Sequence, residues 1–450
     1  MNLANKTKVV ALLLGDVIAL YFSLFVTLLA RYGNDFYGQF TNRHFLPFTI
    51  IFPFWLIIFY IAGLYDLRRL RNNLEFIKIL WLAIFINAVI AVFFFYLLPI
   101  FIITPKTNLF LFAVIFAILE MLWRRWFNLL ASSGEAPNKV LLVGNGETAA
   151  VIRETISANP QLGYEIKARL NEEKINDSPG DLEKAATSNN VNVIVIPRHF
   201  KNRSKPTEEL YNLLNRGIEI RDVANFYELI MRKVPLADLE ESWFLENLAE
   251  HQKFYDPLKR AWEFLAALAI GIALLPLELA IAVLVKLTSQ GPVFIRQKRV
   301  GRLGKQFTLY KFRSMVALAP DGQAETKGPQ WSTPADPRVT VFGKFLRYTH
   351  LDELPQLINI IKSELSFVGP RPERPEFVKV LKEKIPYYEV RMLVKPGVTG
   401  WAQINHRKDT TTEDVIEKLQ YDIYYIKNRS PILDLAIVLR TIKSLFVTPK

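Results

Sequence analysis

The chain has 450 residues, of which 51% are hydrophobic and 22% are charged, and its formal net charge is +13. The mean hydropathy of +0.16 is too high for an average soluble protein and the charged fraction too high for a pure transporter, so we expect a membrane anchor joined to cytosolic domains. The lack of cysteine excludes disulfides and thiolate chemistry. The basic balance predicts anionic partners such as lipid headgroups, phosphates or nucleic acid.

Four apolar stretches predict a transmembrane bundle of four helices over residues 1–130. The stretches cover residues 9–30, 46–66, 76–103 and 108–123. Each approaches or exceeds the ~20 residues that are needed to cross a bilayer. The first stretch lacks the small-residue cleavage site of a signal peptide, so we expect it to remain as a membrane anchor.

Basic residues in the loops predict the orientation of this bundle. Arginines gather after the second stretch and after the fourth: Arg68, Arg69, Arg71, Arg124 and Arg125. The other two loops carry fewer basic residues, so the positive-inside rule places both termini of the bundle in the cytoplasm. Asp16 and Glu120 lie in or at the edge of spans, and we expect them to pair between helices, with a functional role as the alternative.

Residues 138–230 alternate between apolar strands and helices, which predicts a Rossmann-like α/β domain. The expected strands are 139–144, 191–198 and 218–223, and the expected helices are 147–156 and 207–217. Gly144, Gly146 and Ala149 form a G-x-G-x-x-A run whose glycines would let a pyrophosphate approach a helix N-terminus, with Glu172 as a candidate ribose ligand. No nearby residue offers hydride chemistry, so we favour a structural or regulatory role over a bound dinucleotide.

A fifth apolar stretch, residues 262–285, follows a predicted linker at 231–255 and lies near the start of a last domain over 256–450. Basic residues flank it on both sides, which places both of its ends in the cytoplasm. Pro276 near its middle removes a helix hydrogen bond, so we expect a re-entrant helix that breaks at this proline and returns to the same face. An ordinary kinked span is the alternative. At 434–446, helical spacing of apolar residues predicts a helix on the membrane surface or, equally, a core helix.

Two adjacent carboxylates, Asp352 and Glu353, stand ahead of Pro355 in the stretch LDELPQL. Proline is tolerated only in the first turn of a helix, so the pair is expected at a helix N-terminus, where an acidic N-cap is one explanation. Basic residues lie on both sides in the sequence: Lys311, Arg313, Lys344, Arg347 and Arg371. Prolines on either side of Arg371 restrict its reach, as suits a phosphate clamp.

Carboxylates among guanidinium groups favour metal-assisted phosphoryl chemistry. An aspartate whose pKa is depressed can attack phosphorus, a neighbouring acid can help to hold Mg²⁺, and arginines can neutralise charge on the phosphoryl oxygens. A structural network of salt bridges is the alternative for the same residues.

Several motifs follow one another from about residue 256 to the C-terminus. They are PVFIRQKRVGRLGKQFTLYKFRSM, DPRVTVFGKFLRYTHLDELPQL, SFVGPRPE and KPGVTGWAQIN. This region resembles the bacterial polyprenyl-phosphate sugar-1-phosphate transferases, which are monotopic phosphoglycosyl transferases. The bundle and the Rossmann-like domain resemble the long form of that family in architecture only. The expected fold class is therefore a membrane α-helical bundle, an α/β Rossmann-like domain and a small α+β monotopic catalytic domain with a re-entrant membrane helix.

The resemblance implies transfer of a sugar-1-phosphate from a UDP-sugar to undecaprenyl phosphate, at the cytoplasmic face of the bacterial inner membrane, to begin exopolysaccharide or O-antigen assembly. Asp352 would attack the β-phosphate, release UMP and form an aspartyl phosphosugar, while Glu353 would support the nucleophile, and both acids would hold Mg²⁺. Positions that match family residues expected at the substrate phosphates or near the site are Lys311, Arg313, Arg347, Arg371 and Gln403. The chain departs from its relatives at INHRKD, residues 404–409, which bears on sugar or loop details.

Other functions fit part of the sequence. A glycosyltransferase with a D-x-D metal site is disfavoured because the chain has no D-x-D. A non-catalytic membrane scaffold or regulator with a nucleotide-sensing domain is the main alternative, against which the intact acidic pair argues. A nucleic-acid binder would explain the net charge, but no matching signature is present, so no nucleic-acid partner is expected. Glucose or galactose is favoured as the sugar, and a homodimer through the Rossmann-like domain and the bundle is a further expectation.

Overall fold

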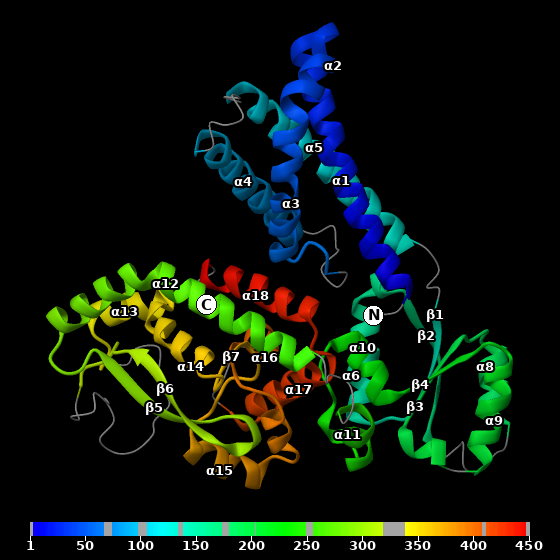
Figure 1. Cartoon of the computed structure of the whole chain (residues 1–450). Helices are drawn as coiled ribbons and strands as arrows, with labels where there is room; N and C mark the ends of the chain where they lie inside the picture. The colour runs from blue at the N-terminus through cyan, green and yellow to red at the C-terminus, as the bar shows by residue number, and fades with distance from the viewer. Residues whose placement is uncertain are drawn as a thin grey trace. The chain divides into compact units, whose positions relative to one another are not determined.

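A computed structural model describes residues 3–66, 74–97, 106–133, 138–172, 180–202, 204–248, 255–317, 338–406 and 411–446. The chain divides into two compact units, Met1–Ile230 and Met231–Lys450, whose elements are labelled in Figure 1. Arg68, Arg69 and Arg71, which contribute to the predicted orientation of the bundle, lie outside the described residues.

The first unit begins with the four predicted apolar segments, and each forms a long helix. These helices are α1 (Leu3–Tyr32), α3 (Phe45–Ala62), α4 (Leu74–Leu97) and α5 (Lys106–Ser133), with η1 (Gly33–Asp35), α2 (Phe36–Gln39) and η2 (Phe40–His44) between the first two. Aromatic rings from α3 and α5 fill the core: Trp55 lies 5.4 Å from Phe112 and 5.3 Å from Phe116, measured between ring centroids. The prediction of four helices is confirmed.

Apolar length alone makes three described segments suitable for crossing a membrane. They are Thr7–Ala62, Phe76–Phe95 and Tyr255–Thr288. The first segment contains most of α1 and all of α3. The stretch predicted as the fourth span, 108–123, forms part of α5 but is not among the three segments. Charged residues at 120, 124 and 125 shorten the apolar part of α5.

A buried ionic network joins the helices of this bundle. Arg124 pairs with Asp16 of α1 and, at 2.7 Å, with Glu120, and it donates to the Leu64 carbonyl at 2.6 Å. The Tyr65 hydroxyl donates to Asp16 at 2.6 Å. The predicted pairing of Asp16 and Glu120 between helices is therefore confirmed for Asp16, while Glu120 orients the shared arginine from the same helix. Arg124 is not a loop charge, because its side chain is buried.

The rest of the first unit is built on a parallel sheet with strand order β2-β1-β3-β4. Its elements are β1 (Asn138–Val143), α6 (Glu147–Ala158), η5 (Pro160–Leu162), β2 (Tyr164–Leu170), α8 (Asp181–Ser188), β3 (Val193–Ile196), η6 (Arg198–Asn202), α9 (Ser204–Asn215), β4 (Glu219–Asp222) and α10 (Val223–Met231). Helices α6 and α10 cover one face and α8 and α9 the other (Figure 1). The predicted α/β alternation is confirmed, and β2 is an additional strand.

The glycine run of this domain lies at the turn from β1 to α6. Gly144 has a φ of +102°, a region that favours glycine. Oε1 of Glu172 lies 3.0 Å from the position that a Cβ atom of residue 144 would take, and its other oxygen lies 3.2 Å from Nε2 of His199. Gly146 is the N-cap residue of α6. The run therefore has the strand-turn-helix setting of a nucleotide loop, and nucleotide binding there stays a prediction.

The second unit starts within the segment predicted as a linker. Residues 231–248 of that segment include η7 (Leu236–Asp238) and α11 (Glu241–Leu248). The Trp401 indole donates to the Arg232 carbonyl at 2.9 Å, and Lys233 pairs with Glu417 at 2.7 Å. The Trp243 side chain is buried. This part of the predicted linker is therefore folded onto the second unit.

The remaining elements of the second unit surround two short sheets. They are α12 (Tyr255–Thr288), β5 (Phe294–Val300), η8 (Arg302–Gly304), β6 (Gln306–Phe312), α13 (Val341–Thr349), η9 (Leu351–Gln356), α14 (Leu357–Ile361), β7 (Ser366–Val368), α15 (Pro375–Lys384), η10 (Tyr388–Met392), β8 (Gly397–Thr399), α16 (Trp401–Asn405), α17 (Thr412–Asn428) and α18 (Pro431–Phe446). Strands β5 and β6 form an antiparallel hairpin, and β7 pairs with β8 in parallel.

Helix α12 does not break at Pro276, contrary to the prediction. It is one continuous helix of 34 residues with this proline inside it, and Figure 1 shows it as an arched ribbon. Its first turns are held by Lys259, whose ammonium donates to the Val368 carbonyl at 2.7 Å. Beyond its last turn, Arg313 donates to the Ser289 carbonyl at 2.7 Å. Both ends of the helix are thus fastened to the same unit.

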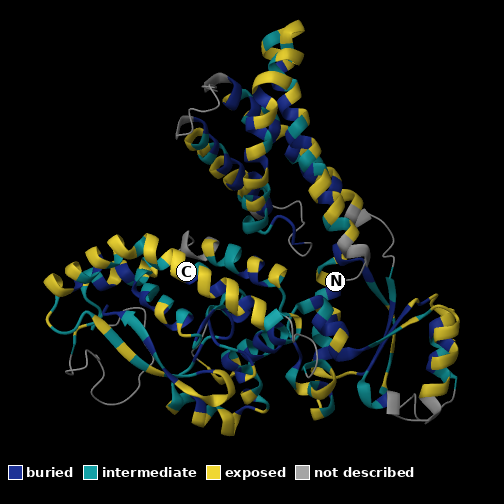
Figure 2. Cartoon of the chain, viewed as in Figure 1, coloured by how far each residue is buried: buried dark blue, intermediate teal, exposed yellow. Residues whose placement is uncertain are grey.

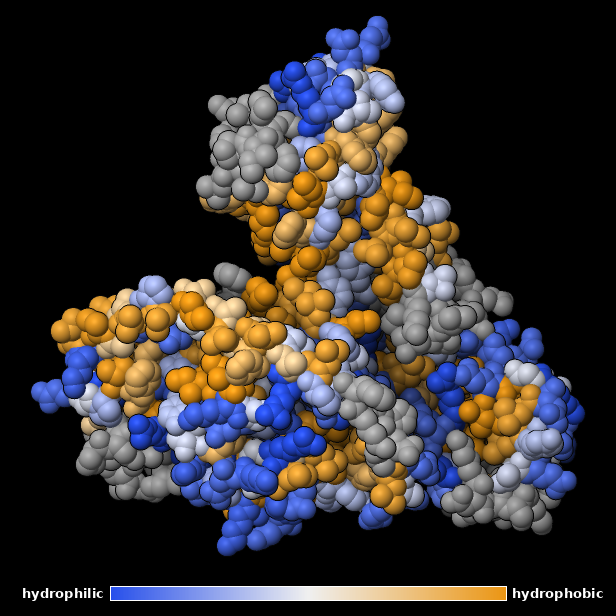
Figure 3. Space-filling model, in the orientation of Figure 1, coloured by the Kyte–Doolittle hydropathy of each residue, from blue (hydrophilic) through white to orange (hydrophobic). Residues whose placement is uncertain are grey.

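Large apolar side chains cover the outer face of α12. The exposed ones are Leu258, Trp262, Phe264, Leu265, Leu268, Ile270, Ile272, Leu275, Leu277, Leu279, Val283, Leu284 and Leu287. Figures 2 and 3 show this exposed apolar band along the helix. Helix α18 uses one face as a core helix, because Ile437 is fully buried, while Ile432 and Leu435 are exposed on the other. Exposed apolar areas of this extent mark interaction surfaces.

Candidate active site

The acidic pair opens onto a cavity of about 450 Å³ in the second unit. The hairpin of β5 and β6 supplies one wall, α13 and η9 a second, and the loop after β7 a third. The predicted residues that line it are Lys311, Arg347, Asp352, Glu353 and Arg371. The fold therefore brings together side chains that are separated by up to 60 positions in the sequence.

The two carboxylates lie in a short 3₁₀ helix and not at a helix N-cap. His350 ends α13 in the left-handed region, and Asp352 and Glu353 follow in the 3₁₀ helix η9, with Pro355 inside it. The residues in the N-cap positions of η9 and α14 are His350 and Gln356, so neither carboxylate is a helix N-cap and that explanation is wrong. The expected helix from 354 onward is instead this 3₁₀ turn followed by the short α14.

Glu353 is held in an ion-pair network, whereas Asp352 is not. Oε1 of Glu353 lies 2.7 Å from Nζ of Lys311 and 3.3 Å from Nη2 of Arg371. Within the described residues, Asp352 has no hydrogen-bond or ion-pair partner, although only 8% of it is exposed. The salt-bridge alternative thus describes Glu353, and the neighbouring aspartate remains available to a ligand.

The electrostatics of the pair reverse one prediction. Burial raises the pKa of the Asp352 carboxyl, although the nearby Lys311 acts in the opposite direction. Burial also opposes ionisation of Glu353, but Lys311 and Arg371 outweigh it and hold the pKa of that carboxyl well below its usual range. The depressed pKa expected for the aspartate therefore belongs to the glutamate, because the cations contact the glutamate directly.

Cations dominate the cavity. The basic lining residues are Arg299, Lys311, Arg338, Arg347, Arg371 and Arg374, and the acidic ones are Asp352, Glu353 and Glu373. Burial lowers the pKa of Arg299 to about 10, and Arg371 and Arg374 contribute in the same direction. Six cations facing three carboxylates form a site that favours a multiply charged anion such as a diphosphate.

Three of these cations are absent from the sequence-based prediction. Arg299 lies on β5 in the run RQKRVGR, Arg338 lies ahead of α13, and Arg374 follows the predicted clamp residue Arg371. In the sequence, the basic run around Arg299 and the segment PRPERP around Arg374 are the features that point to cations at this site. Their common cavity depends on the hairpin folding back over the loop after β7, as shown by the Val300 amide that donates to the Glu373 carbonyl at 2.9 Å.

Two predicted site residues lie outside this cavity. The Arg313 side chain is buried, and its guanidinium donates to Oγ of Ser289 at 2.8 Å, so it fastens the end of α12. The Gln403 amide donates to the Val398 carbonyl at 3.2 Å. Neither residue lines the cavity of the acidic pair. Contact of these two residues with a substrate phosphate stays a prediction.

The acidic pair fits Mg²⁺ only with ligands from a substrate. Within the described residues, no group of three or more His, Asp or Glu side chains could hold a metal ion. Mg²⁺ in phosphate-handling sites is commonly held by one or two carboxylates and completed by phosphate oxygens and water. Asp352 and Glu353 supply two adjacent carboxylates in an otherwise cationic cavity, which matches that arrangement.

Comparison with known proteins shows the family to which the chain belongs. The family "Bacterial sugar transferase" matches residues 254–448. A UDP-glucose:undecaprenyl-phosphate glucose-1-phosphate transferase of Klebsiella pneumoniae is 30% identical over 456 residues, which cover 96% of this chain and 92% of the relative. The protein of the same name from Escherichia coli (strain K12) is 35% identical over 329 residues, covering 69% of this chain and 68% of the relative.

A third relative carries a different sugar in its name. The UDP-N-acetylgalactosamine-undecaprenyl-phosphate N-acetylgalactosaminephosphotransferase of Aeromonas hydrophila is 43% identical over 228 residues. That match covers 51% of this chain and 52% of the relative, so the chain spans about half the length of that protein. Together these matches show that the chain belongs to the bacterial sugar transferases, a family of enzymes, and they confirm the resemblance found in the sequence.

Proposed function

We propose that this protein transfers a sugar-1-phosphate from a UDP-sugar to undecaprenyl phosphate and releases UMP. One observation carries the proposal: Asp352, which is largely buried and has no side-chain partner among the described residues, lines a cavity with six cations, next to a helix whose outer face is apolar. The names of the relatives from three bacteria, which specify sugar phosphate transfer to undecaprenyl phosphate, support it.

The geometry supports a two-step mechanism through Asp352. Its carboxylate oxygen would attack the β-phosphorus of the UDP-sugar, form an oxygen–phosphorus bond and break the bond to the bridging oxygen, which leaves with UMP. The phosphate of undecaprenyl phosphate would then attack the same phosphorus and free the aspartate. Arg347 and Arg371 would neutralise charge on the phosphoryl oxygens. Mg²⁺ bound by Asp352 and Glu353 would supply further charge neutralisation there.

The fastening of α12 supports a location at one face of the membrane. A helix of 34 residues is about 50 Å long at ~1.5 Å per residue, which exceeds the ~30 Å of a hydrocarbon core. A straight span would separate its ends across the bilayer, yet Lys259 and the Ser289 region both contact the second unit. We therefore place α12 as a re-entrant helix, and the catalytic unit on the cytoplasmic face of the bacterial inner membrane, where nucleotide sugars occur.

The sugar, the pathway and the assembly state belong to the same proposal. Relatives named for glucose support a hexose, and the relative named for N-acetylgalactosamine makes that sugar the competing substrate. We assign the reaction to the start of exopolysaccharide or O-antigen assembly. A homodimer through the first unit and a nucleotide-sensing role of the loop at Gly144 and Gly146 stay predictions.

The test measures the nucleotide that purified full-length protein releases from UDP-glucose, UDP-galactose and UDP-N-acetylgalactosamine with Mg²⁺ and undecaprenyl phosphate. We expect UMP from one of these sugars, and at least a thousandfold slower release by Asp352→Asn. Glu376→Gln is the matched control, because this exposed carboxylate on α15 lies outside the cavity. Release of UDP would contradict the mechanism. No turnover with any sugar would favour a membrane scaffold.

A further inference from the structure

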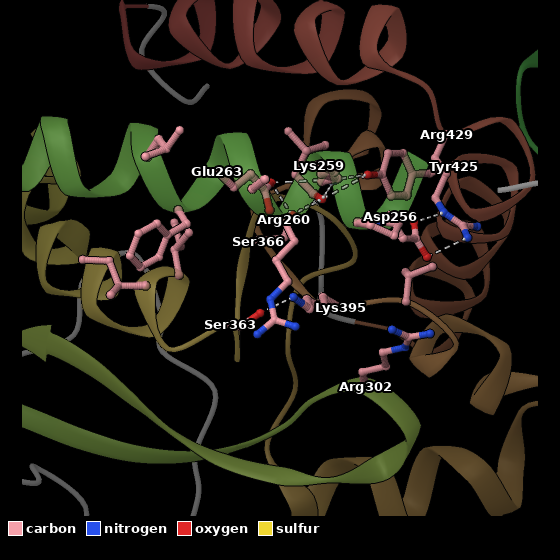
Figure 4. Close-up of a pocket in the computed structure, with 18 residues that line it drawn as sticks. Asp256, Lys259, Arg260, Glu263, Arg302, Ser363, Ser366, Lys395, Tyr425 and Arg429 are labelled. Carbon is pink, nitrogen blue, oxygen red and sulfur yellow. Dashed lines mark hydrogen bonds and ion pairs between the residues drawn. The ribbon is translucent and has the colours of Figure 1, made fainter. Parts of the chain in front are cut away.

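A second cavity of about 750 Å³ lies beside the first half of α12 (Figure 4). Its walls come from α12, from α14 and the loop after it, from the loop before β8, and from Arg302 in the turn of the β5–β6 hairpin. None of its lining residues lines the cavity of the acidic pair. The two cavities are therefore separate sites of the same unit.

The carboxylates of this second cavity already have partners within the protein. Asp256 pairs with Arg429, and Nε of that arginine lies 3.2 Å from Oδ1. Oε1 of Glu263 accepts from the Ser366 hydroxyl at 2.6 Å and from the Phe367 amide at 3.0 Å. Within the described residues, neither carboxylate makes an ion pair with Arg260, Arg302 or Lys395.

Three cations of the lining lack such a carboxylate. Within the described residues, the side chains of Arg260 and Arg302 have no hydrogen-bond or ion-pair partner, and Lys395 donates to the Ser363 hydroxyl. Figure 4 shows Arg260 reaching from α12 toward Ser363 and Lys395, with Arg302 approaching from the hairpin. Burial lowers the pKa of the Lys395 ammonium; Arg260 and Arg302 act in the same direction, and Glu263 and Asp256 in the opposite one. Like charges gathered in this way are stabilised by a bound anion.

Apolar side chains complete the same cavity. Phe264 and Leu265 of α12, with 42% and 64% of their surfaces exposed, line it together with Ile360, Ile361 and Val394. A free phosphate would need only the cations. A cationic cluster with adjoining apolar walls, beside the apolar band of α12, matches a phosphate group that carries an acyl or prenyl chain.

We propose that this second cavity binds the phosphate group of a membrane lipid, held by Arg260, Arg302 and Lys395, with the lipid chain along Phe264 and Leu265. Such a lipid would fix the depth and rotation of α12 in the membrane. The proposal does not depend on sugar transfer, because the cavity shares no residue with the acidic pair. The lipid can be a bulk anionic phospholipid or a polyprenyl phosphate, and the experiment separates the two.

The test counts lipids retained by the full chain in native mass spectrometry. Detergent-purified protein is titrated with phosphatidylglycerol, with undecaprenyl phosphate or with inorganic phosphate. The variant Arg260→Gln/Arg302→Gln removes two exposed charges without known partners. The control Arg296→Gln/Lys298→Gln removes two exposed charges from β5 outside both cavities. Each cation near a lipid surface contributes roughly fivefold to lipid affinity. We therefore expect the affinity of one lipid site to be about 30-fold lower in the test variant than in the wild type and the control.

The identity of the lipid follows from which titration changes. Weakening with phosphatidylglycerol assigns the site to bulk phospholipid, and weakening with undecaprenyl phosphate alone assigns it to the polyprenyl lipid. Equal lipid retention by all three proteins would overturn the proposal. It would also be overturned if inorganic phosphate bound at this site as tightly as either lipid. Because lipid retention is measured without a sugar donor, these outcomes are independent of whether the proposed transfer occurs.

Discussion

Replacing Arg313 by glutamine tests whether this arginine stabilises the fold or binds a substrate phosphate. The Arg313 guanidinium donates to the Ser289 carbonyl at 2.7 Å, to the Ser289 hydroxyl at 2.8 Å and to the Val285 carbonyl at 3.4 Å. These contacts hold the chain immediately after α12. Gly291 leaves the room that the guanidinium needs, since a Cβ atom there would overlap it. The variant Arg313→Gln is therefore expected to lower stability and to leave the phosphate site intact.

The expected loss of stability follows from these hydrogen bonds. Two good hydrogen bonds from a charged donor contribute about 3–6 kcal/mol in total at ~1.5–3 kcal/mol each. The Nε and Nη1 atoms of Arg313 are buried without a partner, and removing them recovers about half of that sum. A net loss of about 1.5–3 kcal/mol remains. For a unit of roughly 200 residues, this lowers the apparent Tm by about 3–12 °C.

The assay is thermal unfolding of the full chain in nanodiscs, followed by intrinsic fluorescence, together with UMP release well below the transition. Arg347→Gln is the matched control, because this arginine lines the cavity and makes one side-chain hydrogen bond, to Ser314 at 3.1 Å. It is expected to slow UMP release with little change in Tm. An Arg313→Gln variant with the Tm of the wild type but no UMP release would refute the structural assignment.

Three further substitutions test other parts of the structure. Glu353→Gln removes the counter-charge of two cavity cations and is expected to slow UMP release at least tenfold with the fold retained, as checked by steady-state kinetics and circular dichroism. Gly397→Ala places a Cβ atom against the backbone nitrogen of Gly369 and is expected to abolish the yield of monodisperse protein. Arg124→Met leaves Asp16 as a buried unpaired charge, a cost of about 3–5 kcal/mol. Adding Asp16→Asn should restore part of the lost protease resistance.

The strands that the sequence predicts best are those that are buried along most of their length. Strands β1 and β3 are buried along most of their length, so their apolar runs are visible in the sequence. Strand β2 escapes prediction because exposed and half-buried residues alternate along YEIKARL after its first residue, which leaves no continuous apolar run.

Even within one motif, the sequence predicted the residues of the site only in part. Lys311 and Arg313 are two positions apart, a spacing that puts side chains on one face of a strand. Strand β6 ends at Phe312, however, and beyond that point the alternation no longer applies. Arg313 therefore turns toward α12 while Lys311 faces the cavity. The end of a strand depends on its partner β5, which the local sequence does not specify.

Under the proposed mechanism, the unequal setting of the two carboxylates gives each of them a different role. Lys311 and Arg371 lie close enough to the acidic pair to neutralise any carboxylate that points to them, and Glu353 takes both of them. Asp352 is therefore spared an ion pair that would have to break before the aspartate could bind a metal or attack phosphorus. A single aspartate in the same place would pair with Lys311 and lose that availability. The glutamate acts as the counter-charge that keeps its neighbour unpaired, and the cations it holds remain directed into the cavity for a substrate phosphate.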